Sequence, residues 1–448
     1  MELKDLVITP LILLIVYFLA FFFQAKVVDS TTRRYFIPAL TVKIIGAMAV
    51  GIIYQFYYDG GDTFAFHTHG SRIIWEAFIN DPVKGLDLFL ANGEYNGATF
   101  EYSSKIWYFR DQQTYLLIRV AFLLDLLTFS TYSATAVLFA VVSFTGMWAL
   151  FQTFYSEFRD QHFWLALAIL FVPSVFFWGS GILKDTLTLG CLGWMTYTFH
   201  RVIIKRRLAI IHVIVFFLAA YLTYSIKKYI LLSFLPALII WVAAEYLGKM
   251  KNLVIKLLIA PMVVSLCVAL GYSAVQSVGK DDPRYALGNI AKTAQITAYD
   301  IRYGWGARFG DGSGYTLGEL DGTFSSMIRL GPKAINVALF RPYLWEVSNP
   351  LMILSAAEAL ISLLLTLWVI YKVSIKSFVL NLFKPWVLFC MVFALVFAFA
   401  VGISTYNFGT LARYKIPLLP YYFTGLALLR YYGGLKRAKK LTSSDASA

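Results

Sequence analysis

Charged residues are scarce in this sequence of 448 residues, because Asp, Glu, Lys and Arg together make up only 14% of it. A soluble globular domain carries about 25% charged residues, whereas 59% of this chain is hydrophobic. The scarcity of charge excludes an ordinary soluble domain and indicates an integral membrane protein. The apolar stretches are long and continuous, not short and alternating, which excludes an outer-membrane barrel.

Cysteine is also rare. The three cysteines, Cys191, Cys267 and Cys390, all lie in apolar stretches without metal-type spacing, so we expect neither a disulfide framework nor a cysteine metal site. Internal repeats and low-complexity segments are absent. The net charge of +14 comes mostly from Lys and Arg in short loops between apolar stretches, as membrane topology requires. We therefore expect membrane lipid as a partner and no nucleic acid.

The apolar stretches predict an all-α polytopic membrane protein with about eleven transmembrane helices. Each stretch is near the roughly 20 residues that cross a bilayer. The first lacks the basic start and the cleavage site of a signal peptide, so we expect it to be retained. The expected spans are roughly 8–24, 36–57, 134–155, 163–178, 182–200, 208–225, 229–247, 255–276, 348–371, 385–404 and 411–431.

The basic loops assign the sides of the membrane. By the positive-inside rule, the loops after the first, fifth, seventh and ninth spans and the basic tail are cytoplasmic, and the N-terminus is outside. This parity requires that the apolar segment 114–130 does not cross. The segment carries Arg119 and Asp125, which favours a helix lying in the outer interface.

Two long loops then fall on the outer face. The first, about 58–113, contains eight acidic and four basic residues, and the second, about 277–347, is rich in Gly and Tyr. Both are long enough to fold over the membrane surface and form a site. We expect three parts: residues 1–35 as an extra helix and cytoplasmic loop, 36–247 as a module with the first outer loop, and 248–448 as the remaining helices with the second outer loop and the basic tail.

The first outer loop begins with the sequence from Tyr57 to His69, which contains two carboxylates, two adjacent glycines and two histidines. Asp59 and Asp62 stand where a membrane helix ends. One interpretation is a polar turn, because Asp-Gly-Gly-Asp is good turn chemistry. The functional alternatives are a general base or a ligand of a divalent cation. His67 and His69 could join a metal site, but His-x-His alone is a weak indication.

Other charged residues stand at helix ends on the same outer face. Lys184 and Asp185 begin a helix that has no further charge before Arg201. Asp185 is also favourable at a helix N-terminus for purely structural reasons. Lys227 and Lys228 run against the positive-inside bias, and binding an anion such as a phosphate would explain them.

The second half of the chain offers further candidates. Arg341 and Glu346 end the second outer loop, where they bind substrate or pair with each other. Arg413 and Tyr414 open the last helix from outside. Acids near Asp62 with cations at these helix ends suit chemistry on a phosphate-bearing lipid, in which a base activates an acceptor and cations stabilise the departing phosphate.

At these residues the chain resembles the GT-C superfamily of multi-pass glycosyltransferases, which includes protein O-mannosyltransferases and the lipid A aminoarabinose transferase. Asp62 to Phe66 looks like the family's Asp-Glu-x-x-Tyr motif, with Thr63 in place of the second acid. The segment 114–130 looks like its juxtamembrane helix. Further similar positions are Pro173 through Asp185, Lys227 or Lys228, and Arg413 through Pro420.

The resemblance covers about 36–247 and the last helix. It implies a membrane glycosyltransferase that moves a sugar from a polyprenyl-phosphate donor to a glycan or protein acceptor. Asp62 would be the base with Asp59 as its neighbour. The stretch Arg341–Glu346 is similar to one in bacterial membrane proteins of surface-polysaccharide assembly, so we expect a bacterial inner membrane with a periplasmic active face. The cofactor stays open, and a divalent cation held by Asp59, Asp62 and His67 is one alternative.

Two other functions compete. A polysaccharide polymerase or ligase that acts on lipid-pyrophosphate glycans would use the second outer loop, with Arg302, Arg308 and Arg341. A transporter or flippase of lipid-linked sugars would show repeated halves and binding groups near the bilayer midplane. Here the charged residues gather at one face instead.

Overall fold

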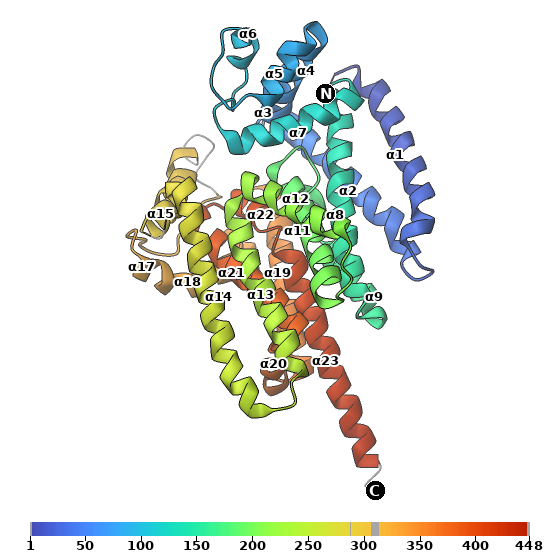
Figure 1. The fold of residues 1–448 in the computed structure, drawn as a ribbon, viewed down its shortest axis with the longest axis vertical. Helices are drawn as coiled ribbons and strands as arrows, with labels where there is room; N and C mark the ends of the chain where they lie inside the picture. Colours follow the sequence, from blue (N-terminus) through green and yellow to red (C-terminus); the bar gives the residue numbers. More distant parts are fainter. Residues whose placement is uncertain (1, 287, 306–312, 446–448) are drawn as a thin grey trace. The chain divides into compact units, whose positions relative to one another are not determined.

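The computed structural model describes residues 2–286, 288–305 and 313–445, and these residues fold as an all-α membrane protein (Figure 1). Within these ranges no strand forms, and Gly314 and Asn407 make an isolated β-bridge. Six of the described helices are long and apolar enough to cross a membrane. They are α1 (Asp5–Val27), α2 (Arg33–Phe56), α8 (Tyr132–Tyr155), α13 (Lys228–Lys249), α19 (Pro350–Val373) and α21 (Pro385–Thr405).

The expected count of about eleven spanning helices is not confirmed. The segment 163–178 is two short helices, α9 (His162–Leu170) and α10 (Pro173–Trp178). The division has a local cause, because Pro173 has no N–H to donate and disfavours helical geometry in the residue before it. The segments 182–200 and 208–225 form α11 (Lys184–Phe199), with 16 residues, and α12 (Ile210–Ile226), with 17.

The chain divides into two compact units. The first unit comprises Met1–His162 and Leu170–Lys227, and the second comprises Phe163–Ile169 and Lys228–Ala448. The boundary expected near residue 247 lies within the second unit, at the end of α13. The first unit also contains shorter helices: α3 (Asp62–Phe66), η1 (His67–Ser71), α4 (Arg72–Asn80), α5 (Pro82–Leu90), α6 (Phe100–Ser103), α7 (Gln112–Thr128), η2 (Arg159–Gln161) and η3 (His200–Ile204).

Contacts between the long helices of the first unit show the direction in which each helix runs. The backbone N–H of Ser133, in the first turn of α8, donates to Asp5 of α1 at 2.9 Å, and Gln152 near the end of α8 donates to the Val27 carbonyl at 3.2 Å. Therefore α1 runs parallel to α8. The ring of Phe36 packs on those of Phe144 and Trp148, so α2 runs antiparallel to α8.

Helices α8 and α11 also run parallel and approach closely. A Cβ on Gly146 would lie only 2.0 Å from the Gly190 carbonyl oxygen, so glycine is required at this crossing. Beyond their last turns, the side chains of Glu157 and His200 come within 3.2 Å. Helix α12 returns antiparallel, because Lys227 after its last residue contacts Asp185 in the first turn of α11.

These directions give the first unit two chemically different ends. We call one the acidic end, which carries carboxylates from the starts of α1, α3 and α7, and the other the basic end. The acidic end contains Glu2, Asp5, Asp59, Asp62 and Asp111, and the basic end contains Lys26, Arg33, Arg34, Arg201 and Lys205.

Helix α7, the segment expected to lie in the interface, begins and ends at the acidic end. Asp111 at its start lies 3.8 Å from Lys184 of α11. After its last residue, the Ser130 carbonyl accepts a hydrogen bond from Arg72 at 3.3 Å. Helix α7 therefore does not run from one end of the first unit to the other. The assignment of the basic loops to one side of the membrane requires such a helix that does not cross.

A buried lysine binds the backbone where the chain leaves α10. Lys43, in the middle of α2, is only 3% exposed. Its Nζ donates to the carbonyls of Gly179 at 2.6 Å and Val175 at 3.4 Å and to Ser143 Oγ at 2.9 Å. The Val175 carbonyl also accepts from the Gly179 N–H at 3.2 Å. Carbonyls beyond the end of a helix are not satisfied by the helix itself and in a bilayer need a partner from the protein, and Lys43 supplies one to Gly179.

The second unit is built around α21. This helix packs against α13, α18 (Gly331–Phe340) and α23 (Leu419–Asp445). The buried indole of Trp241 stacks on Phe389 with ring centres 4.4 Å apart. The unit also contains α14 (Leu253–Asp281), η4 (Pro283–Tyr285), α15 (Ile290–Tyr299), η5 (Asp300–Trp305), α17 (Phe324–Arg329), η7 (Leu344–Glu346), α20 (Ile375–Leu382) and α22 (Phe408–Tyr414).

At the basic end, Glu157 is held by two bases. Lys205 Nζ lies 2.5 Å from its carboxylate and His200 Nε2 lies 3.2 Å away. Burial alone would raise the pKa of Glu157, but the hydrogen bonds from His200 and Lys205 and the charge of Lys205 outweigh it and lower the pKa to about 2. The carboxylate thus joins α8 to the end of α11.

We expect replacement of Lys43 by Met to lower the thermal stability of the detergent-solubilised protein. The carbonyls of Val175 and Gly179 would lose a donor in an apolar interior, at a cost of roughly 1–3 kcal/mol. Thermal unfolding measures the effect, with Ser143→Ala as the matched control that removes one of the three partners and should shift the midpoint less. An unchanged or higher midpoint for Lys43→Met would mean that burying the ammonium costs more than its hydrogen bonds return.

A second prediction concerns acid stability. Because the pKa of Glu157 is lower in the folded state than its usual value of 4.5, the carboxylate stabilises the fold above about pH 4.5, and this contribution is lost as the pH falls toward 2. Glu157→Gln should therefore cost about 1–3 kcal/mol at pH 7 and progressively less below pH 4.5. Unfolding midpoints of parent and variant between pH 7 and pH 3 test this, and a gap that does not narrow contradicts it.

Candidate functional site

The turn between α2 and α3 is formed by three consecutive residues with positive φ. Asp59 has a φ of 52°, and Gly60 and Gly61 have 119° and 114°. Asp is one of the few non-glycine residues that adopt this conformation. A Cβ on Gly61 would lie 2.9 Å from the ring of Tyr54, so glycine also provides space there. The polar turn suggested by the sequence is present, and it fixes the direction in which Asp59 leaves the helix.

A pocket of about 360 Å³ opens beside this turn at the acidic end. It contains three carboxylates, one guanidinium and one aromatic pair. Its lining residues are Glu2, Asp5, Gln55, Asp59, Gly60, Phe64, Thr68, Arg72 and Tyr132.

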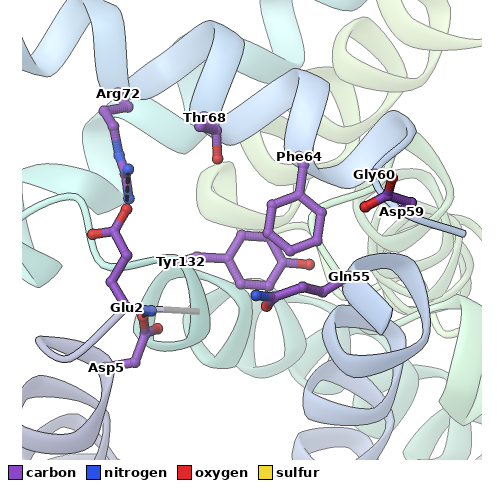
Figure 2. A pocket seen from close by; sticks show the side chains of 9 residues that line it. All are labelled: Glu2, Asp5, Gln55, Asp59, Gly60, Phe64, Thr68, Arg72 and Tyr132. Atoms are coloured by element: carbon purple, nitrogen blue, oxygen red, sulfur yellow. Dashed lines mark hydrogen bonds and ion pairs between the residues drawn. The ribbon is translucent and has the colours of Figure 1, made fainter. Parts of the chain in front are cut away.

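Figure 2 shows how these side chains are arranged. The rings of Phe64 and Tyr132 stack with centres 4.3 Å apart. Asp59 lies on one side of this stack, and Glu2, paired with Arg72, lies on the other. Burial alone would raise the pKa of Glu2, but the hydrogen bond and charge of Arg72 outweigh it and lower the pKa. The pocket thus offers carboxylate acceptors around an aromatic face, which suits a polar ligand with hydroxyl groups.

Asp62 and His67 occupy other places. Asp62 is the first residue of α3 and is partly buried, but it does not line the pocket. His67 is fully buried, with Nε2 3.4 Å from Asp125 of α7. His69 stacks on Trp107 with ring centres 4.1 Å apart. Among the described residues no group of three or more His, Cys, Asp and Glu is placed to hold a metal ion, so Asp59, Asp62 and His67 do not form such a group.

Asp185 and Lys227 form a buried ion pair. The Asp185 side chain is fully buried, that of Lys227 is 8% exposed, and Lys227 Nζ donates to Asp185 Oδ1. Nearby in the chain, Lys184 is 17% exposed and lies 3.8 Å from Asp111. The ion pair holds the Lys227 ammonium beside Asp185, and a catalytic part for Asp185 stays a prediction.

One hydrophobic core joins these elements. Tyr54 at the end of α2, Phe66 after Asp62, Tyr115 after Asp111, Leu183 before Lys184 and Ile226 before Lys227 are all buried in it. Each candidate side chain of the first unit therefore stands within a few residues of this shared core, at the acidic end. The sequence predicted one site from acids near Asp62 and Asp185 with cations at 227, 228 and 413, and that common site stays a prediction.

The remaining candidates belong to the second unit. Lys228 lies 4.0 Å from Asp282. Arg341 Nε donates to Glu346 at 2.9 Å, so these two residues pair with each other, one of the alternatives that the sequence left open. The guanidinium of Arg413 lies over the ring of Tyr414 at 5.6 Å.

The arginines of the second outer loop are only partly described. Arg302 donates to the Tyr315 carbonyl at 2.5 Å and is therefore part of the loop's own structure. Arg308 lies outside the described residues. The part of either residue in substrate binding stays a prediction.

Sequence reasoning missed four of the pocket's polar groups. Glu2 and Asp5 lie at the N-terminus, and Arg72 and Tyr132 are separated from Asp59 by a whole loop and by α7. No spacing along the chain relates them. Lys43, by contrast, had a visible signal, because a lone lysine within an apolar span is rare and needs a partner.

No protein-family model matches the chain. Neither a curated protein nor a solved structure matches it.

We expect the pair formed by Asp185 and Lys227 to be strongly coupled. Lys227→Met should destabilise the protein by about 3–5 kcal/mol, because it leaves a buried carboxylate without its cation. The double variant Asp185→Asn, Lys227→Met should recover much of this loss. Thermal unfolding of the two single variants and the double variant measures the coupling, and additive effects would contradict it.

Proposed function

We propose that the protein is a membrane glycosyltransferase of the GT-C type, which transfers a sugar from a polyprenyl-phosphate donor to an acceptor in cell-surface glycan assembly. The observation that carries the proposal is the acidic turn from Asp59 to Asp62 beside a carboxylate-lined pocket. The residues around this turn pack in the same hydrophobic core as the start of α11, which carries Lys184. Charged groups buried among membrane helices, such as Asp185 and Lys227, are costly and often mark a functional site.

The reaction needs a base and an anion site. The acceptor hydroxyl oxygen attacks the anomeric carbon of the donor sugar, the bond from that carbon to the phosphate oxygen breaks, and polyprenyl phosphate leaves. A carboxylate of the turn takes the hydroxyl proton. Cationic side chains stabilise the negative charge of the departing phosphate.

In this proposal the base, the acceptor site and the phosphate-binding cations all belong to the first unit. The pocket receives the acceptor, whose hydroxyl groups donate to Asp59 and whose apolar face packs on Phe64. Lys184 and Lys227 face the donor phosphate, and Asp185 positions Lys227. The resemblance assigns the base to Asp62, whereas the pocket favours Asp59. Lys228, Arg341, Glu346, Arg413 and Tyr414 of the second unit stay predicted substrate-binding residues.

The charges at the two ends of the first unit support an orientation in the membrane. The basic end carries the excess of Lys and Arg that marks cytoplasmic loops. We therefore assign the acidic end, with its pocket, to the periplasmic face of a bacterial inner membrane, where polyprenyl-phosphate sugars are consumed.

The test is sugar transfer by the purified protein from a panel of labelled polyprenyl-phosphate monosaccharides to membrane glycolipids and proteins. Asp62→Asn and Asp59→Asn are assayed separately. The variant that removes the base should lower kcat by roughly 10²–10⁴-fold, with little change in thermal stability.

Asp87→Asn is the matched control, because Asp87 is an exposed carboxylate of the same outer loop and does not line the pocket. Its activity should equal that of the parent. Full activity in both Asp59→Asn and Asp62→Asn would overturn the assignment of the base. No transfer from any polyprenyl-phosphate sugar would overturn the donor class.

A further inference from the structure

A second and larger cavity lies in the first unit, away from the acidic pocket. It is a groove of about 1070 Å³ bordered by α1, α2, α7, α8, α11, η3 and α12, slightly above the roughly 300–1,000 Å³ of small-molecule sites. Its walls are aliphatic and aromatic. They include Val16, Leu19, Phe23, Leu40, Phe144 and Trp148.

The groove is long in the direction of the membrane helices. Along α1 its lining runs from Ile12 to Val27, which corresponds to roughly 22 Å at the rise of an α-helix. Half of a bilayer's hydrocarbon core is about 15 Å thick. The groove is therefore deep enough for a complete acyl chain of one leaflet.

Cations stand at one end of this apolar groove. Lys26 and Arg201 both line it, and no acidic side chain does. Both residues belong to the basic end, where Val27 accepts from Gln152 and Glu157 contacts Lys205. His212, another lining residue, has a buried Nδ1 without a hydrogen-bond partner.

In the part of the chain that the structure describes, the two cations have no carboxylate partner. Among the described residues neither Lys26 nor Arg201 forms an ion pair, whereas Lys205 at the same end is paired with Glu157. Lys26 Nζ lies 5.0 Å from the ring centre of Phe22, and the Arg201 guanidinium lies 5.1 Å from that of Tyr197. Both side chains line the groove and give it a positive charge.

We propose that this groove holds an anionic glycerophospholipid. Its acyl chains lie along α1, and its phosphate is bound by Lys26 and Arg201 at the basic end. The charge of the mouth selects the anion, because a lysine or arginine near a membrane surface attracts an anionic lipid by about 1 kcal/mol. The length and apolar walls of the groove select a lipid over a free phosphate. The occupant bridges α1 to α11 and α12.

This site is separate from the sugar-transfer site, and the proposal does not depend on that activity. The experiment is native mass spectrometry of the full-length protein in detergent, titrated with phosphatidylglycerol or with phosphatidylcholine that carries the same acyl chains. We expect phosphatidylglycerol to be retained roughly tenfold more tightly than phosphatidylcholine.

Two variants examine the two halves of the site. Lys26→Gln, Arg201→Gln should remove the preference for phosphatidylglycerol. Ala20→Phe should narrow the groove without a change of charge and reduce the retention of both lipids, because Ala20 is a lining residue. The matched control is Arg33→Gln, Arg207→Gln, which removes the same charge from two exposed residues that do not line the groove.

Four outcomes would overturn the proposal. Equal retention of the two lipids would show an unselective lipid annulus. Equal loss of the preference in the control variant would show an effect of net charge alone. Unchanged retention in Ala20→Phe would place the lipid elsewhere. If inorganic phosphate raised the unfolding midpoint of the protein as much as phosphatidylglycerol does, the site would be one for a free anion.

Discussion

The hydrogen bonds from Lys43 to the carbonyls at the end of α10 support the candidate site. A broken helix inside a membrane protein exposes backbone groups that lipid cannot satisfy. Lys43 reaches them from the middle of α2, the helix whose end carries Asp59. The chain can therefore turn at Gly179–Leu183 and begin α11 with Lys184 and Asp185. One side chain thus ties the helix that presents the acidic turn to the segment that presents the buried ion pair.

The distribution of charged side chains also distinguishes the two cavities of the first unit. At the acidic end, carboxylates outnumber cations, and the pocket is polar and small. At the basic end, Lys26 and Arg201 border an apolar groove about three times as large. A hydroxyl-rich ligand and a lipid chain need opposite surroundings. The polar pocket and the cations of the groove lie at opposite ends of the first unit, and the two cavities share no lining residue, so one ligand would not displace the other.

The long apolar helices could be predicted from the sequence better than the breaks within apolar segments. Hydropathy located α1, α2, α8, α13, α19 and α21, because each is a long apolar run. It could not reveal that 163–178 breaks before Pro173, since both pieces are apolar. It also identified α7 by its internal charges. Those charges are explained by contacts across the fold, such as Asp125 beside His67.

The candidate site was predictable only where its residues stand close together in the chain. The turn chemistry from Asp59 to Gly61 is local and could be recognised from composition. The pairing of Asp185 with Lys227 depends on the antiparallel return of α12, and the pocket depends on the N-terminal residues packing beside Tyr132. These are tertiary relations, and no spacing rule contains them.

The parallel course of α8 and α11 constrains the membrane topology of this chain. Two consecutive long helices that run in the same direction require an intervening return of the polypeptide, whether or not that return resembles a spanning helix. The contact of Glu157 with His200 places the ends of α8 and α11 on a common side, and their parallel course places both starts on the other side. Counting apolar segments becomes unnecessary for this part of the chain. The relative sidedness of Asp59, Asp185 and Lys227 is a property of the packing and would survive any revision in the number of spans.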